Sequence, residues 1–301
     1  MDNTTCRDIF NNGERFHRQI PRGRAGHRPA TDMSGPAPHS RPPALLILTA
    51  LAVEAAALGG SRLPACGALG NGQIRVVRCG VGRQAVLAAA AHHLAGCGIV
   101  GSMGLSGGLA PDLHPGTIVL ADQVLGPRPG TGWPCDPDLV DLLEELLRRR
   151  HIPCRRGPLL CVDAPLLTPA DKQAALGRTG ALAVDMESAA AARAAHMGGL
   201  PFFSLRVICD PAGRRLAPEL LAGVDPQGNS RPGRLLVQLL RRPWLLPRFL
   251  AMGRDFSLAR RSLRRSWRIL RDPLAARAST ARTANGDPQR LQRMMHGLEH
   301  G

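Results

Sequence analysis

Short apolar runs alternate with segments of helical period through the middle of the chain. The runs fall at residues 45–49, 74–79, 99–102, 117–121, 159–162, 182–184 and 202–208, and the helical segments at 83–94, 137–150 and 187–196. Strands buried on both faces have continuous apolar sequences, and parallel strands need crossover helices. The pattern therefore predicts one α/β domain with a mixed, largely parallel central sheet flanked by helices.

The two ends of the chain have a different character. Residues 1–43 are rich in Arg, Pro and Gly without an apolar period, so we expect a disordered segment, with Met33 as an alternative start. The α/β domain is expected over 44–240, a basic amphipathic helical extension over 241–275, and a disordered tail over 276–301.

The extension carries apolar residues at intervals of three or four, from Trp244 through Leu263 and Trp267 to Leu270, with arginines between them. One interpretation is a helix lying on a membrane surface with its apolar stripe in the lipid. The other is a terminal helix packed on the core with a solvated basic face.

The first apolar run, 44–53, also has two interpretations. It could belong to a secretory signal with a cleavage site near Ala57, or it could be the first buried strand. The run ends at an acidic residue, Glu54, and continues into an Ala-rich helical stretch, which favours the strand. We expect a cytoplasmic protein, peripheral on the inner face of the membrane if the extension binds lipid.

Composition narrows the range of partners. The chain has 39 Lys plus Arg against 23 Asp plus Glu, a formal net charge of +16, yet Lys172 is its single lysine. No zinc-finger or RNA-recognition motif accompanies the charge, so we expect no nucleic-acid partner. The eight cysteines include no CxxC pair, and we expect neither a metal site nor a cofactor.

Four segments could carry chemistry. The glycine-rich run Gly104–Gly108 could bring backbone amides close to an anion or sugar, or be a simple turn. A carboxylate in the Asp185–Glu187 segment could accept bonds from vicinal hydroxyls, or merely cap a helix. Asp210 follows a strand and could protonate a leaving group, and Glu54 could deprotonate a water.

These segments together resemble the purine nucleoside phosphorylase and nucleosidase superfamily. The resemblance rests on GSMGLSGGLAPDLHPGTIVLAD at 101–122, ALAVDMESAAAA at 181–192 and FFSLRVICDPAG at 202–213, and with Glu54 it covers roughly 44–230. Within the superfamily, the TALAVEA opening and the Arg-rich extension most resemble the hopanoid-associated phosphorylase.

The resemblance implies a role for each matching residue. Met186 and Glu187 would bind ribose, Asp210 would protonate purine N7, and Glu54 would lie near an attacking water. Ser106 and Gly107 would face the sugar and the nucleophile.

The chain departs from the superfamily's pattern at two sites. Pro165 and Leu166 stand where nucleosidases carry an aromatic residue that stacks on adenine, so we place Leu166 in the base site. Glu54 and Gly101 stand where phosphorylases hold phosphate with arginines, which leaves Arg83 with Ser106 as candidate phosphate ligands. Hydrolysis and phosphorolysis both stay open at this point.

The implied activity is cleavage of an N-glycosidic bond, with water or phosphate as co-substrate. The expected substrate is adenosylhopane, which would release adenine and give ribosylhopane or phosphoribosylhopane. The alternative is a soluble purine nucleoside such as methylthioadenosine or S-adenosylhomocysteine. We also expect a homo-oligomer.

Overall fold

The computed structural model describes residues 44–59, 68–70, 73–216, 225, 227–229 and 246–284. The segments predicted to be disordered, 1–43 and the end of the tail at 285–301, lie outside these residues.

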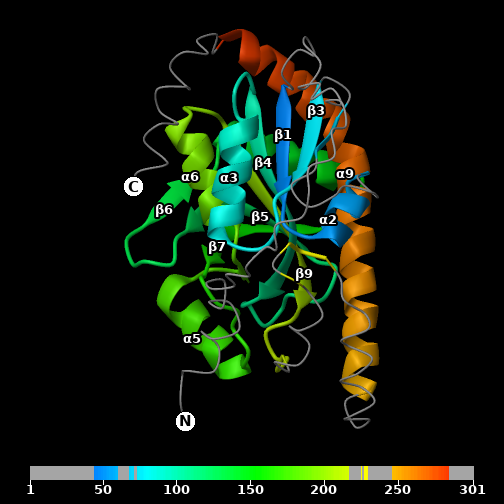
Figure 1. Cartoon of the computed structure of the whole chain (residues 1–301). Helices are drawn as coiled ribbons and strands as arrows, with labels where there is room; N and C mark the ends of the chain where they lie inside the picture. The colour runs from blue at the N-terminus through cyan, green and yellow to red at the C-terminus, as the bar shows by residue number, and fades with distance from the viewer. Residues whose placement is uncertain are drawn as a thin grey trace, which may run out of the picture. The chain divides into compact units, whose positions relative to one another are not determined.

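The described residues form one nine-stranded mixed sheet with helices packed against it (Figure 1). Its strands are β1 (Leu45–Thr49), β2 (Ala68–Gly70), β3 (Ile74–Arg78), β4 (Ile99–Gly108), β5 (Ile118–Leu125), β6 (Gly132–Pro134), β7 (Cys154–Cys161), β8 (Ala183–Asp185) and β9 (Phe202–Asp210). The pairs β1–β3, β1–β4, β4–β9, β5–β7 and β7–β8 are parallel. This agrees with the predicted α/β class and the largely parallel sheet.

Five of the strands close on one another. β4 pairs with β8, β8 with β7, β7 with β5, β5 with β9, and β9 again with β4. β1, β3 and β2 extend the sheet from the first half of β4. The second half of β4 is thus held between β8 and β9, which brings the ends of all three strands together.

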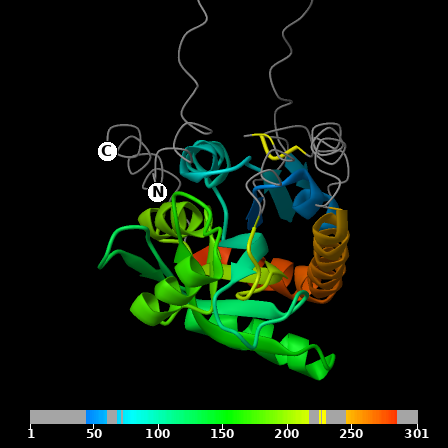
Figure 2. The same cartoon turned by 90° about the horizontal axis from the view of Figure 1, so that it is seen from below.

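Helices cover the sheet from both sides (Figures 1 and 2). They are α2 (Ala52–Ala57), α3 (Arg83–His93), α4 (Pro137–Arg149), α5 (Pro169–Thr179), α6 (Ser188–Met197) and α9 (Leu246–Ala284). α3 packs on β1 and on α6, whereas α9 packs on β1, β4 and β9. The run 44–53 is therefore the buried strand β1 followed by the start of α2, as one of its two interpretations predicted.

The glycine-rich run differs from its expected form, because Gly104–Gly108 is not a loop but the second half of strand β4. Its residues pair with β9, from Gly104 opposite Arg206 to Gly107 opposite Asp210. Glycine is required here by close packing: a Cβ on Gly104 would lie 2.6 Å from Oε1 of Glu54.

The C-terminal helix corrects two expectations. It continues to Ala284, past the boundary expected at residue 275. Its stripe of Ala259, Leu263, Trp267 and Leu270 is buried in the main core, so these side chains are not available to lipid. The sequence could not distinguish the two cases, because an apolar stripe has the same period whether protein or lipid covers it.

Candidate active site

The site forms at the ends of β1 and β8, against the middle of β4 and β9. Glu54 lies in the first turn of α2, directly after β1, and is 4% exposed. Its Oε2 accepts hydrogen bonds from Thr49 Oγ1 at 2.8 Å, Ala50 N at 3.0 Å and Leu51 N at 2.8 Å, and its Oε1 accepts one from Leu105 N at 2.7 Å. Four donors, from β1, the turn that follows it and β4, therefore fix this carboxylate against the middle of β4.

The two carboxylates at the end of β8 have separate roles. Asp185 caps α6, accepting from Ser188 N at 3.2 Å and from Ser188 Oγ at 2.6 Å, and it also accepts from Arg206 Nε at 2.7 Å. Glu187 accepts from Gly82 N at 2.9 Å and makes no side-chain cap. The capping interpretation thus holds for Asp185, which leaves Glu187 as the carboxylate that faces the pocket.

Arg206 is a site residue that the sequence analysis missed. It is 4% exposed on β9, forms an ion pair with Asp185 at 2.6 Å, and donates to Ser102 Oγ at 2.6 Å. An arginine inside an otherwise apolar strand predicts a buried charge, and a buried charge needs a partner of opposite sign. The sequence did not show that Asp185 supplies the partner.

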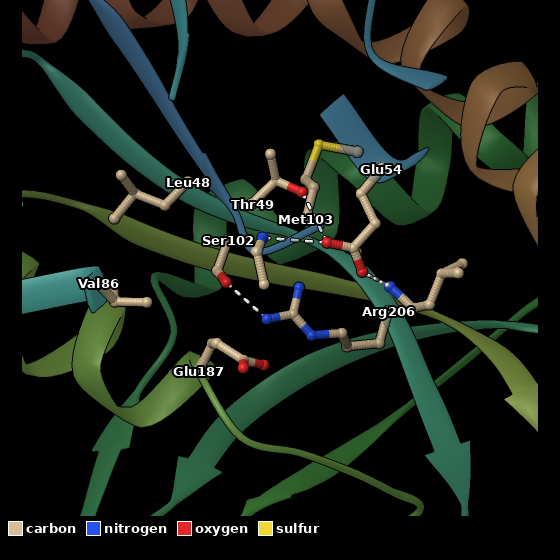
Figure 3. A pocket seen from close by; sticks show the side chains of 11 residues that line it. Leu48, Thr49, Glu54, Val86, Ser102, Met103, Glu187 and Arg206 are labelled. Carbon is tan, nitrogen blue, oxygen red and sulfur yellow. Dashed lines mark hydrogen bonds between the residues drawn. The ribbon is translucent and has the colours of Figure 1, made fainter. Parts of the chain in front are cut away.

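A small pocket joins these groups (Figure 3). Glu54, Glu187 and Arg206 line it together with residues of β1, the turn after β1, α3 and β4: Leu48, Thr49, Ala50, Val86, Ser102, Met103, Gly104 and Leu105. Figure 3 shows the carboxylates of Glu54 and Glu187 on either side of the Arg206 guanidinium. The pocket therefore presents two carboxylates and a cation at the carboxyl ends of parallel strands, where α/β sheets bind ligands.

The carboxyl group of Glu187 is electrostatically perturbed. Burial raises its pKa from the usual 4.5 to about 7, with a further upward contribution from the charge of Asp185, and the Gly82 amide only partly opposes this. A carboxylate with a pKa near neutrality, in a pocket, is typical of a functional group.

A second polar group lies beside the end of β9. Asp210 is 8% exposed, and its Oδ2 accepts from Lys172 Nζ at 2.5 Å. Burial raises the pKa of Asp210, and the ammonium of Lys172 opposes that shift. Lys172 comes from α5, a helix that the sequence analysis did not predict, so nothing in the sequence connected the two residues.

Two buried oxygen atoms near Asp210 lack a hydrogen-bond partner: Asp210 Oδ1 and Ser106 Oγ. Buried polar atoms are rarely left unpaired, and those that are need an explanation such as a missing ligand. Ser106 and Gly107 lie on β4 directly beside Ile208 and Asp210 of β9. The unpaired Oδ1 of Asp210 therefore marks a place at the end of β9 where a polar ligand would be satisfied.

Strand β4 connects the two groups. Glu54 bonds to Leu105, and Asp210 lies opposite Gly107, two residues farther along the strand. Two residues of extended chain span about 7 Å. Both groups therefore lie along the same half of β4.

The other predicted site residues differ in how they are placed relative to the pocket. Met186 is partly buried next to Glu187, and Leu166 packs against the small apolar cluster that includes Val184. Arg83 is exposed in the first turn of α3, whose Val86 lines the pocket in its place. Among the described residues, no hydrogen bond or ion pair joins Arg83 to another predicted site residue.

Comparison with known proteins places the chain in a family. A family model described as the phosphorylase superfamily matches residues 48–241. The chain belongs to this superfamily. Its members' chemistry makes it an enzyme that cleaves N-glycosidic bonds, in agreement with the expected reaction class.

The relatives include nucleosidases. Over 188 residues the chain is 25% identical to a 5′-methylthioadenosine/S-adenosylhomocysteine nucleosidase of Aeromonas salmonicida, covering 54% of this chain and 79% of the relative. Two Helicobacter pylori structures share its fold, each at 16% identity and covering 76% of this chain and 97% of theirs. They are a 5′-methylthioadenosine/S-adenosyl homocysteine nucleosidase with a bound pyrrolidine compound, at a TM-score of 0.58, and futalosine hydrolase, at 0.57.

Proposed function

We propose that this phosphorylase superfamily member hydrolyses the N-glycosidic bond of a 5′-substituted adenine nucleoside and releases adenine. The observation that carries the proposal is the placement of Glu54, Glu187 and Asp210 around the second half of β4. Each has a part in the reaction, and no cofactor takes part.

Glu54 is the group that would orient and deprotonate water. Cleavage leaves positive charge on the ribosyl carbon, and a nucleophile must be positioned there. The four donors on Glu54 hold its carboxylate at the pocket wall, facing the same space as Glu187. Glu187 and the neighbouring Met186 would bind the ribose, with Glu187 accepting hydrogen bonds from its hydroxyls.

Asp210 is the group that would protonate the leaving base. The electron pair of the broken bond moves onto the purine, and a proton delivered to N7 neutralises it. Oδ1 of Asp210 has no partner in the described structure and is available for this contact. Ser106 and Gly107, on the neighbouring strand β4, would face the sugar and the nucleophile. Leu166 would contact the base through its apolar side chain.

Water is favoured over phosphate by the packing at residue 101. The superfamily's phosphorylases have an arginine there, but a Cβ on Gly101 would lie 2.3 Å from Cζ of Phe203, so no side chain fits. Glu54 occupies the other arginine position with a negative charge. Arg83, the remaining phosphate candidate, is exposed and absent from the pocket lining.

The substrate is proposed from the relatives. The Aeromonas relative is named for 5′-methylthioadenosine and S-adenosylhomocysteine, so these two nucleosides are the first to test. The experiment measures adenine release from each by the purified protein, with and without phosphate. Release that does not depend on phosphate, with free ribosyl product, is expected. Phosphate-dependent release of a ribose 1-phosphate would overturn hydrolysis, and no release from any adenine nucleoside would overturn the function.

A lipid-linked nucleoside such as adenosylhopane is a second candidate substrate, favoured by the exposed face of α9. Arg260, Arg261, Arg264 and Arg265 are exposed along this helix, and near its start Leu250 is 66% and Leu246 44% exposed. Exposed basic residues on a helix that also exposes apolar side chains fit an anionic membrane surface. Among the described residues, no helix has the length and apolarity to cross a bilayer.

Vesicle binding tests this second candidate. The protein should co-sediment with anionic vesicles at low salt, less so at high salt, and less after replacement of the four arginines by Gln. Turnover of a membrane-embedded nucleoside should fall in that variant while turnover of methylthioadenosine is kept. A parental protein that stays in the supernatant with anionic vesicles would remove the support for a lipid substrate.

A further inference from the structure

The only lysine of the chain is buried beside the proposed proton donor. Lys172 lies in the first turn of α5 and is 1% exposed. Its Nζ donates to Asp210 Oδ2 at 2.5 Å, to the Pro211 carbonyl at 3.0 Å and to the Arg214 carbonyl at 3.1 Å. Three acceptors match the three donors of an ammonium group, and burying a charge is costly unless it is paired in this way.

The contact with Lys172 makes the two carboxyl oxygens of Asp210 different. Oδ2 is held by Lys172, whereas Oδ1 is buried without a partner in the described structure. The contact with Lys172 therefore restrains the carboxyl group and leaves Oδ1 as the oxygen that can meet the base.

We propose that Lys172 is a positioning residue for N-glycosidic cleavage, which fixes Asp210 and stabilises the carboxylate that Asp210 becomes when its proton passes to the base. This inference rests on the proposed function. The proton leaves Asp210 Oδ1 for N7 as the glycosidic electron pair moves onto the purine, and Asp210 gains one negative charge. The Lys172 ammonium is next to that charge, so its attraction is greatest after transfer, and an interaction that strengthens toward the transition state accelerates the reaction.

The surroundings of Asp210 make Lys172 the dominant partner. Three charged groups act on Asp210: Lys172 of α5, Arg214 after β9 and Asp255 of α9. Arg214 and Asp255 form an ion pair with each other, so their charges largely cancel at Asp210. Removing Lys172 therefore leaves the Asp210 carboxylate in a buried place without a compensating charge.

The test compares Lys172→Gln and Lys172→Arg in the full chain, with adenine release followed as a function of pH. Gln keeps donors for the two carbonyls but loses the charge, whereas Arg keeps the charge. In Lys172→Gln, kcat should fall by about tenfold or more. The high-pH limb of the kcat profile, where Asp210 loses its proton, should move to higher pH by about 1–3 pH units. Lys172→Arg should recover much of the rate and keep the limb near its parental pH. Arg178→Gln, which removes an exposed charge from the same helix, is the matched control and should change neither.

The outcomes separate this inference from the proposed function. If the parental protein releases no adenine, the function fails before any variant is made. If Asp210→Asn loses activity while Lys172→Gln keeps the parental pH profile, the function stands and the role of Lys172 is wrong. If both Lys172 variants fail to fold, as shown by circular dichroism, the residue is structural and the inference is also wrong.

Discussion

Replacing Glu187 by Gln should make the protein more stable and less active at the same time. Burial and Asp185 hold the pKa of Glu187 at about 7 in the folded chain, against 4.5 for an ordinary glutamate. The folded state therefore binds this proton more tightly than the unfolded state does. The contribution of Glu187 to the free energy of unfolding is fully present below pH 4.5 and is lost as the pH rises through 7. The reason is that an ionised Glu187 costs free energy only in the folded chain.

The size of the effect follows from the two pKa values. A pKa difference of one is equivalent to about 1.4 kcal/mol, so the difference here gives an upper limit of about 3 kcal/mol at pH 8 and less than about 1 kcal/mol at pH 5. Partial exposure of the side chain reduces this, and we expect a gain of about 2 kcal/mol at pH 8. Gln stays neutral at every pH, and its carbonyl can still accept the hydrogen bond from Gly82.

Thermal unfolding of both proteins from pH 5 to pH 8 measures this gain. The variant's melting temperature should exceed the parental one by about 4–8 °C at pH 8, and the excess should shrink toward pH 5. Its kcat/KM should fall by about tenfold or more, because the neutral amide replaces the anion that accepts bonds from the ribose hydroxyls.

Glu145→Gln is the matched control. Glu145 is exposed on α4, and hydrogen bonds from Arg148 and Arg149 lower its pKa to about 2, the opposite direction. This change should leave activity unaltered and should not stabilise the protein at pH 8. The electrostatic reasoning would be refuted if the Glu187→Gln variant were less stable than the parental protein at pH 8. It would also be refuted if the difference in melting temperature were the same at pH 5 and pH 8. Unchanged activity would refute the ribose role.

The other predictions concern the proton donor, the β4 glycine and the α9 helix. Asp210→Asn should lower adenine release by about 10²-fold or more with circular dichroism unchanged, since an amide cannot supply the carboxyl proton, and parental turnover would exclude Asp210 as the donor. Gly104→Ala places a Cβ 2.6 Å from the Glu54 carboxylate and should lower kcat, whereas Gly213→Ala, where nothing lies within 4 Å, should not; equal activities would show that the position of Glu54 is unimportant. Leu263→Ala should cost about 2–5 kcal/mol of unfolding free energy and Leu250→Ala less than about 0.5 kcal/mol, because the first is 0% and the second 66% exposed; denaturant titration giving similar losses would contradict the packing of α9.

Hydrophobic pattern and local chemistry determined the fold class and most of the elements. The buried strand β1 was predicted at its observed bounds, and α4 and α6 to within one residue. These elements could be predicted because each carries its own signal: a continuous apolar run for a doubly covered strand, and an apolar period for a helix. The candidate residues Glu54, Glu187 and Asp210 were also identified from the sequence, because each lies at the end of a strand.

The partners of these residues were decided by tertiary structure alone. Arg206 pairs with Asp185 and Lys172 with Asp210 across separate elements, and no local period in the sequence connects residues so far apart. The glycine run was expected as a loop, yet it is a strand because β8 and β9 supply hydrogen-bond partners on both sides. The stripe of α9 was equally compatible with lipid and protein, and only its packing on the sheet showed that the core buries it.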